Sequence, residues 1–97
     1  MKFEPRFDKL QIDTEPRNLL FISEPYVCIQ RLGFCVVADA QLSSSIGKKN
    51  VSILLGAQSL SVPLFERMKE NNNSLIGIEV YIYKESPEKI SKYKVVD

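Results

Sequence analysis

The sequence predicts a small, mostly β domain, built as a five-stranded antiparallel barrel with one α-helix between the third and fourth strands. Stretches rich in β-branched and aromatic residues recur between residues 19 and 96. A helical spacing of apolar residues occurs only once, between residues 61 and 71. The sequence has no strand–helix–strand repeat, which disfavours a doubly wound parallel sheet.

A chain of 97 residues has the size of one domain. Residues 1–18 are charged and weakly patterned, so we expect a loosely structured N-terminal lead followed by the barrel at residues 19–96. A β-sandwich fragment or an α+β roll would use the same strands, and both are alternatives to the barrel.

The first two strands are predicted to form a hairpin. Residues 19–31 have the composition of a strand, but Pro25 cannot donate a hydrogen bond to a neighbouring strand. We therefore expect two strands here, or one strand broken at a bulge or an edge. Leu32 and Gly33 are placed at the turn, and residues 34–42 form the next strand. A polar loop then leads to the third strand of the barrel, at residues 50–56.

The helix is predicted to begin at Ser61 and to end near Asn71. Serine is a good N-cap, and Pro63 falls in the first turn, where its missing N–H costs nothing. Leu64, Phe65 and Met68 form a narrow apolar stripe, which suits a helix that closes one end of a barrel.

The last two strands follow the helix. Between residues 75 and 85, aliphatic side chains alternate with glycine, glutamate and tyrosine, so one face is expected to be buried; its members are Ile76, Ile78, Val80 and Ile82. A charged loop begins at Glu85, and residues 92–96 form the final strand.

The composition excludes several kinds of chemistry. The chain has no histidine, which is the commonest general acid or base and the commonest metal ligand, and its four glycines form no phosphate-binding cluster. We therefore expect no enzymatic activity, no metal site and no cofactor. No apolar run is long enough to span a bilayer and no signal-peptide core is present, so we expect an intracellular, cytoplasmic protein without membrane contact.

The two cysteines lie on either side of the predicted turn. With Leu32 and Gly33 at its apex, Cys28 faces Val37, and Cys28 and Cys35 are diagonal neighbours. Diagonal Cα atoms are about 7–8 Å apart, which is too far for a good disulfide. We therefore expect two free thiols, which also fits a reducing compartment. A disulfide between them is the alternative, since a different register at the turn would change their separation.

The C-terminal part of the chain points to a known family. From Leu75 to Val96, a glycine-containing strand, a charged loop and a Lys-Tyr-Lys strand follow one another. Together with the order of elements over residues 19–96, this resembles the small single-domain OB-fold proteins that bind single-stranded DNA. The resemblance implies a non-catalytic module that binds single-stranded nucleic acid with little sequence specificity.

Aromatic and basic residues are the candidates for such a site, because aromatic rings stack on bases while lysine and arginine contact phosphates. The aromatic candidates are Tyr81, Tyr83 and Phe34, and the basic ones are Arg31, Lys48, Lys49, Lys84, Lys89, Lys92 and Lys94. A competing interpretation is that the tyrosines only cover a sheet face, and that the lysines interleaved with glutamates belong to a solvated loop.

A protein-interaction or assembly subunit is the second function that we consider. It would be a small barrel that forms a homodimer or binds a protein partner, without nucleic acid. The net charge of +1 and the apolar residues Leu54 and Val96 on the expected outer faces favour this alternative.

Overall fold

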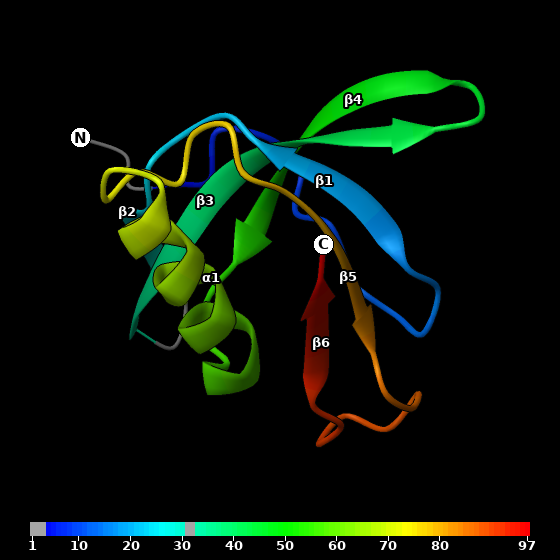
Figure 1. Ribbon diagram of the computed structural model, residues 1–97. Helices are drawn as coiled ribbons and strands as arrows, with labels where there is room; N and C mark the ends of the chain where they lie inside the picture. The colour runs from blue at the N-terminus through cyan, green and yellow to red at the C-terminus, as the bar shows by residue number, and fades with distance from the viewer. Residues whose placement is uncertain (1–3, 31–32) are drawn as a thin grey trace.

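The computed structural model describes residues 4–30 and 33–97. It contains one helix and six strands (Figure 1). In chain order these are β1 (Arg17–Phe21), β2 (Tyr26–Gln30), β3 (Gly33–Ser44), β4 (Gly47–Leu54), α1 (Gln58–Glu70), β5 (Glu79–Lys84) and β6 (Tyr93–Val96). The prediction of a mostly β domain with one helix between strands is therefore confirmed.

All strand pairs in the sheet are antiparallel, and β3 is the longest strand. The first part of β3 pairs with β2, and its last part pairs with β1 and with β4. On its other edge β1 pairs with β5, which in turn pairs with β6. The strand β1 thus joins the half of the sheet made by β3 and β4 to the half made by β5 and β6.

The break at Pro25 makes six strands from the five that we expected. Residues 22–25 interrupt the first strand, so that β1 and β2 pair with different parts of β3. A proline has no N–H to donate to the ladder, which is why the strand cannot continue through this position. The sequence prediction of two strands, or one broken strand, is confirmed.

The predicted closure of the sheet into a barrel is wrong. Within residues 4–30 and 33–97, β4 and β6 do not pair. The outer edge of β4 is instead taken by the N-terminal lead: the Leu10 N–H donates to the Ser52 carbonyl, and the Ser52 N–H donates to the Asp8 carbonyl, both at 2.9 Å. Further along, the Lys84 N–H donates to the Asp13 carbonyl at 2.7 Å. The lead, expected to be loose, therefore runs along the seam where a barrel would close, and it pairs with β4 there without closing the sheet.

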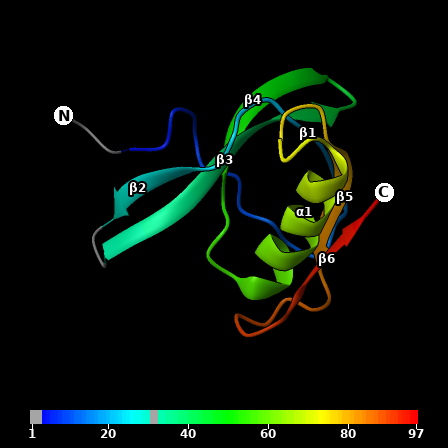
Figure 2. The ribbon, with the colours of Figure 1, turned by 60° about the vertical axis from the view of Figure 1, so that its left-hand side comes forward.

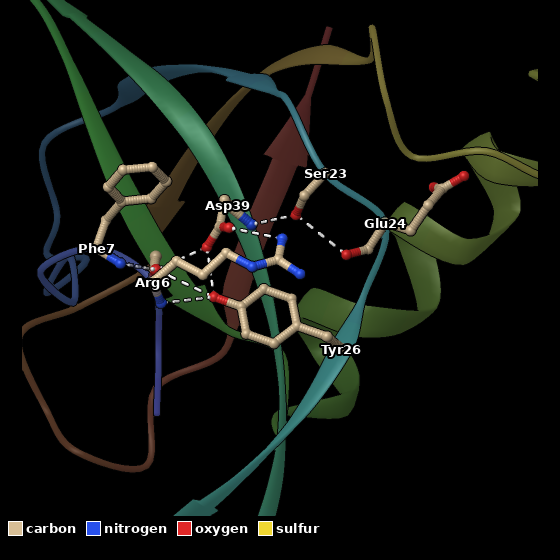
Figure 3. A network of polar contacts seen from close by, with 7 residues as sticks. Arg6, Phe7, Ser23, Glu24, Tyr26 and Asp39 are labelled. Carbon is tan, nitrogen blue, oxygen red and sulfur yellow. Dashed lines mark hydrogen bonds and ion pairs between the residues drawn. The ribbon is translucent and has the colours of Figure 1, made fainter. Parts of the chain in front are cut away.

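A buried carboxylate holds the lead in place (Figure 3). The Asp39 side chain on β3 is almost fully buried and accepts hydrogen bonds from the Tyr26 hydroxyl at 2.6 Å and the Ser52 hydroxyl at 2.7 Å. The Arg6 guanidinium forms an ion pair with Asp39 at 3.3 Å and lies over the Tyr26 ring at 4.2 Å. The Phe7 N–H donates to the Ser52 hydroxyl at 3.0 Å. Two successive lead residues are thus fixed to one buried charge.

The hydrophobic core lies between α1 and one face of the curved sheet, which we call the core face. It contains aliphatic side chains from the lead, β1, β3, β4, α1 and β5 and one aromatic ring; its members include Ile12, Leu19, Phe21, Val51, Ile53, Leu60, Leu64, Leu75, Val80 and Ile82. Ile12 comes from the lead, which therefore contributes to the core as well as to the sheet edge.

The helix begins four residues earlier than predicted, because its N-cap is Ala57 where we expected Ser61. Gln58 is its first residue, and the Ala57 carbonyl accepts the N–H groups of Leu60 and Ser61. No side chain caps this end, so the sequence carries no cap signal at the true start. The C-terminal end agrees with the prediction, since Asn72 and Asn73 have φ values of 55° and 58°, the left-handed conformation that asparagine tolerates.

The helix packs against β6 at the C-terminal end of the chain. The Ser59 hydroxyl accepts the Tyr93 N–H at 3.0 Å, and the Arg67 guanidinium forms an ion pair with Asp97 at 2.9 Å. Arg67 also donates to the Val95 carbonyl at 3.4 Å. These contacts fix β6 beside the helix. Within the described residues, no helix is long and apolar enough to cross a membrane.

The strand β5 is shorter than the predicted span of residues 75–85. It begins at Glu79, because Gly77 has a φ of 92° and breaks the extended conformation before it. Val80 and Ile82 are buried as expected, but Ile76 precedes the break and is half exposed. The alternation that we predicted therefore holds only from Ile78 onward.

The register of the β2–β3 hairpin also differs from the prediction. Gln30 pairs with Gly33, so Cys28 pairs directly with Cys35, where we expected Cys28 to face Val37. The shift of two residues keeps each side chain on its face of the sheet, so the apolar pattern does not distinguish the two registers. Both cysteines are free, but the diagonal arrangement on which we based that expectation is wrong, because the two residues are direct partners.

The buried Asp39 network generates a stability prediction. Asp39→Ala leaves the Tyr26 and Ser52 hydroxyls and the Arg6 guanidinium without their shared acceptor. We expect the free energy of unfolding in urea to fall by about 2–4 kcal/mol. The control is Asp8→Ala, whose exposed carboxylate only faces Lys49 at 3.9 Å and whose loss should cost less than about 0.5 kcal/mol. Equal losses of stability in the two variants would contradict the stabilising role of the buried Asp39 carboxylate.

A second prediction concerns alkaline pH. Burial raises the pKa of the Tyr26 phenol, and its hydrogen bond to Asp39 adds to the rise. The protonated Tyr26 hydroxyl therefore contributes its full stabilisation of the fold below the ordinary tyrosine pKa of about 10. This stabilisation is lost as the pH rises through the pKa of Tyr26 in the folded protein. Phenylalanine does not titrate, so the stability difference between wild type and Tyr26→Phe should shrink above pH ~10.

Urea unfolding of both proteins from pH 7 to about pH 11 measures this difference. The pKa of the Cys28 thiol is also raised by burial, but both proteins contain Cys28, so its titration cancels in the comparison. A difference that stays constant or grows with pH would show that the Tyr26 pKa is not raised.

Candidate nucleic-acid interface

The face of the sheet opposite the core, which we call the outer face, carries part of the predicted site. One row of direct cross-strand partners runs over it from β4 to β6, in the order Lys48, Ser43, Asn18, Tyr81 and Val96. Neighbouring strands are about 4.8 Å apart, so the backbones of Lys48 and Tyr81 are separated by about 14 Å. The row thus places a cation, two small polar side chains and an aromatic ring on one continuous surface.

The two tyrosines of β5 share this face, as their alternation predicts. Tyr81 is 43% exposed and Tyr83 is half-buried. Tyr83 pairs with Lys94 on β6, and Tyr81 pairs with Val96 on one side and with Asn18 on the other. Their Cα atoms are about 7 Å apart along the strand. The outer face of β5 and β6 therefore carries an exposed tyrosine next to a half-buried tyrosine and a lysine.

The charges on the outer face are mixed. Lys48 is exposed and has no ion pair among the described residues, whereas the Lys94 ammonium lies 3.1 Å from the Glu85 carboxylate. Glu79 is also exposed, on the same face of β5 as Tyr81. The face therefore offers local cations beside the tyrosines without a strong positive field, in keeping with the net charge of +1.

The structure separates several predicted site residues from this face. Lys49 follows Lys48 and therefore points to the other face, where its ammonium lies 3.9 Å from Asp8. Lys84 lies on the core side, with its ammonium 5.8 Å from the centre of the Tyr93 ring. Lys89 and Lys92 are exposed in the loop between β5 and β6, beyond the ends of the two strands.

Phe34 lies in a different region, on a projecting hairpin that we call the arm. The arm consists of β2 and residues 33–37 of β3, and it extends away from α1 and from β5 and β6 (Figure 2). Phe34 is 80% exposed, and nine residues of extended strand separate it from Ser43, a distance of about 30 Å. Phe34 is therefore remote from the tyrosines. Arg31 lies outside the described residues.

Sequence reasoning missed a hollow at the open seam of the sheet. It has a volume of about 440 Å³ and lies between the lead, β4 and β6; its walls include Leu10, Ile12, Ile53, Leu60, Lys84 and Tyr93. A smaller hollow of about 370 Å³ shares Gln11, Ile12 and Lys84 with it. The alternation of Leu10 and Ile12 with polar residues was the signal that this segment packs on the core, although nothing local identifies β4 as its neighbour.

No family model, curated protein or solved structure matches the chain. The function therefore has to be inferred from the geometry of the molecule. Among the residues that the structure describes, no three acidic or cysteine side chains cluster in a way that could hold a metal ion. The buried Asp39 carboxylate is occupied by its donors Arg6, Tyr26 and Ser52.

Proposed function

We propose that the protein is a non-catalytic module that binds single-stranded nucleic acid, in particular DNA, on the outer face of the sheet. The observation that carries this proposal is the placement of Tyr81 and Tyr83 on one exposed face, with Tyr83 beside Lys94 and Tyr81 in the same row as Lys48. Bases would stack on the tyrosines, and the two lysines would contact the phosphates on either side.

The chemistry of this face suits binding with little sequence specificity. Stacking on an aromatic ring contributes about 1–3 kcal/mol per base and is possible with every base. Asn18 and Ser43 are the polar side chains between Tyr81 and Lys48, and each reaches only a small part of a base edge. Affinity would therefore come from stacking and from phosphate contacts, with no set of donors and acceptors to select a sequence.

The order in which the strands pair supports a relation between this fold and the OB-fold. In our proposal the broken strand β1–β2 is the first strand of the barrel, because it pairs with β3 and also with β5. The helix α1 falls between β4 and β5, the position expected for the helix of that fold. The lead would replace the last strand pairing of the barrel, so the domain is an opened variant.

Fluorescence polarisation of a labelled single-stranded DNA of about six nucleotides tests the proposed site. We expect binding that weakens with salt, with a log–log slope of roughly −0.7 for each phosphate neutralised. Tyr81→Ala combined with Tyr83→Ala should lower the affinity more than about tenfold, because two stacking partners are lost.

Phe34→Ala is the matched control, because it removes an aromatic ring that is more exposed than either tyrosine but lies on the arm. Its affinity should stay within about twofold of wild type, since a short oligonucleotide on the outer face does not reach it. Absence of binding to the oligonucleotide at low salt would contradict the proposed function. A loss of affinity in Phe34→Ala alone would show that the oligonucleotide binds to the arm and not to the outer face.

A second candidate function is assembly with another protein chain through the arm. Val27, Ile29 and Phe34 lie on one face of the arm, and each is at least half exposed. This face continues the core face of β3 beyond the part of the sheet that the core covers. Leu54 and Val96, the apolar residues singled out from the sequence, are also exposed. Apolar side chains grouped in this way are typical of interaction sites.

Light scattering over a range of protein concentrations tests the second candidate. Three side chains expose less area than the roughly 800 Å² per partner of a standard interface, so we expect weak, concentration-dependent association. Phe34→Glu should abolish it. Ile46→Glu, at an apolar residue in the β3–β4 turn that is even more exposed than Phe34, should leave it unchanged. A wild-type protein that is monomeric at every concentration would exclude self-assembly through the arm.

A further inference from the structure

The only two cysteines of the chain are direct cross-strand partners on the arm. Cys28 lies in the middle of β2 and Cys35 near the start of β3, and the pairing register places them opposite each other. The next pair on the same face is Tyr26 with Val37, so the cysteines adjoin the Asp39 network. Neither proposed function uses these thiols.

The distance between the two backbones suits a disulfide. Directly opposed residues in an antiparallel pair have Cα atoms about 4.5–5.5 Å apart, and disulfides form at Cα separations of about 4.4–6.8 Å. Both side chains also project from the same face, because opposed residues on paired strands share a face. Closing the bond therefore needs side-chain rotation and no change of strand register.

The two thiols differ in their access to solvent. Cys28 is 0% exposed, whereas Cys35 is partly exposed. Burial raises the pKa of the Cys28 thiol, and the nearby Cys35 and Asp39 add to the rise. The thiolate is the attacking species in disulfide exchange, so a reagent from solution meets Cys35 first.

We propose that Cys28 and Cys35 form a thiol–disulfide exchange site that reacts with small-molecule disulfides and closes to an intramolecular disulfide across the arm. Cys35 is the residue that reacts with the external disulfide, and Cys28 is the residue that resolves the mixed disulfide. The inference rests on the strand register and on the unequal exposure of the two thiols, and it is independent of nucleic-acid binding.

The reaction has two balanced steps. The Cys35 thiolate bonds to one sulfur of the small disulfide, whose S–S bond breaks, and the released thiolate takes up a proton. Cys28 then loses its proton, its thiolate bonds to the Cys35 sulfur, and the second small thiol leaves in the same way. The protein loses two protons and two electrons, and the small disulfide takes them up and is reduced to two thiols.

The product would change the arm. In the reduced protein β2 is held to β3 by the pairing of the two strands. A covalent bond between Cys28 and Cys35 would fix this register and limit separation of the two strands. The exposed apolar residues Ile29 and Phe34 are the immediate neighbours of the cysteines in sequence, so the same bond would also fix their positions.

Oxidised glutathione, added to the reduced full-length protein at about pH 8, tests the proposal. We expect the intact mass to fall by about 2 Da and both thiols to be lost, with no lasting glutathione adduct. The disulfide should join residues of one chain, so the protein should migrate as a single chain under non-reducing conditions.

Two matched variants separate the roles of the cysteines. Cys28→Ser should accumulate a stable glutathione adduct on Cys35, because nothing resolves the mixed disulfide. Cys35→Ser should be modified at least about tenfold more slowly, because Cys28 is buried. Circular dichroism of each variant confirms that the fold is retained.

Several results would overturn the proposal. A wild-type protein that keeps a glutathione adduct would show that Cys28 does not resolve it. Disulfide-linked dimers would show that the partner sulfur lies on another chain. Absence of any reaction, or equal rates in Cys35→Ser and wild type, would contradict the roles given to the two thiols.

Discussion

The structure depends on how the buried charge of Asp39 is satisfied. A carboxylate that leaves water for the interior is strongly destabilising unless donors surround it. Two donors, Tyr26 and Ser52, come from the strands on either side of β3, while Arg6 comes from the lead. Ser52 also accepts the Phe7 N–H and the Tyr26 hydroxyl accepts the Arg6 N–H, so three polar contacts hold the lead to the network. The lead therefore supplies the positive charge that pairs with Asp39, so the charge is neutralised only when the lead is docked.

This single constraint also decides which surfaces are open. Asp39 and Ser43 lie on the same face of β3, four residues or about 14 Å apart. The lead covers the region around Asp39, and the row from Lys48 through Ser43 to Tyr81 stays uncovered. Because the lead also occupies the free edge of β4, the sheet remains open at the seam. The proposed binding face is thus the part of the outer face that the lead does not reach.

The sequence predicted features that depend on local chemistry. The missing N–H of Pro25 located the break in the first strand, and alternation placed Tyr81 and Tyr83 on the exposed face of β5. The hairpin register was missed because a slip of two residues leaves every side chain on its face. The pairing of the lead with β4 was missed because it joins residues about forty positions apart, with no local pattern. Asp39, alone in an apolar strand, was the available signal.

Hydrogen exchange at the lead shows whether the buried Asp39 carboxylate holds the lead against β4. The amides of Leu10 and Ser52 each donate to a carbonyl across the contact between the lead and β4, so they report on docking. We expect both amides to be protected in the wild-type protein. Asp39→Asn should remove their protection, while the amides of Val80 and Ile82 on β5 stay protected. Rapid exchange of both reporter amides in the wild type, or full protection in Asp39→Asn, would contradict the role of the buried carboxylate.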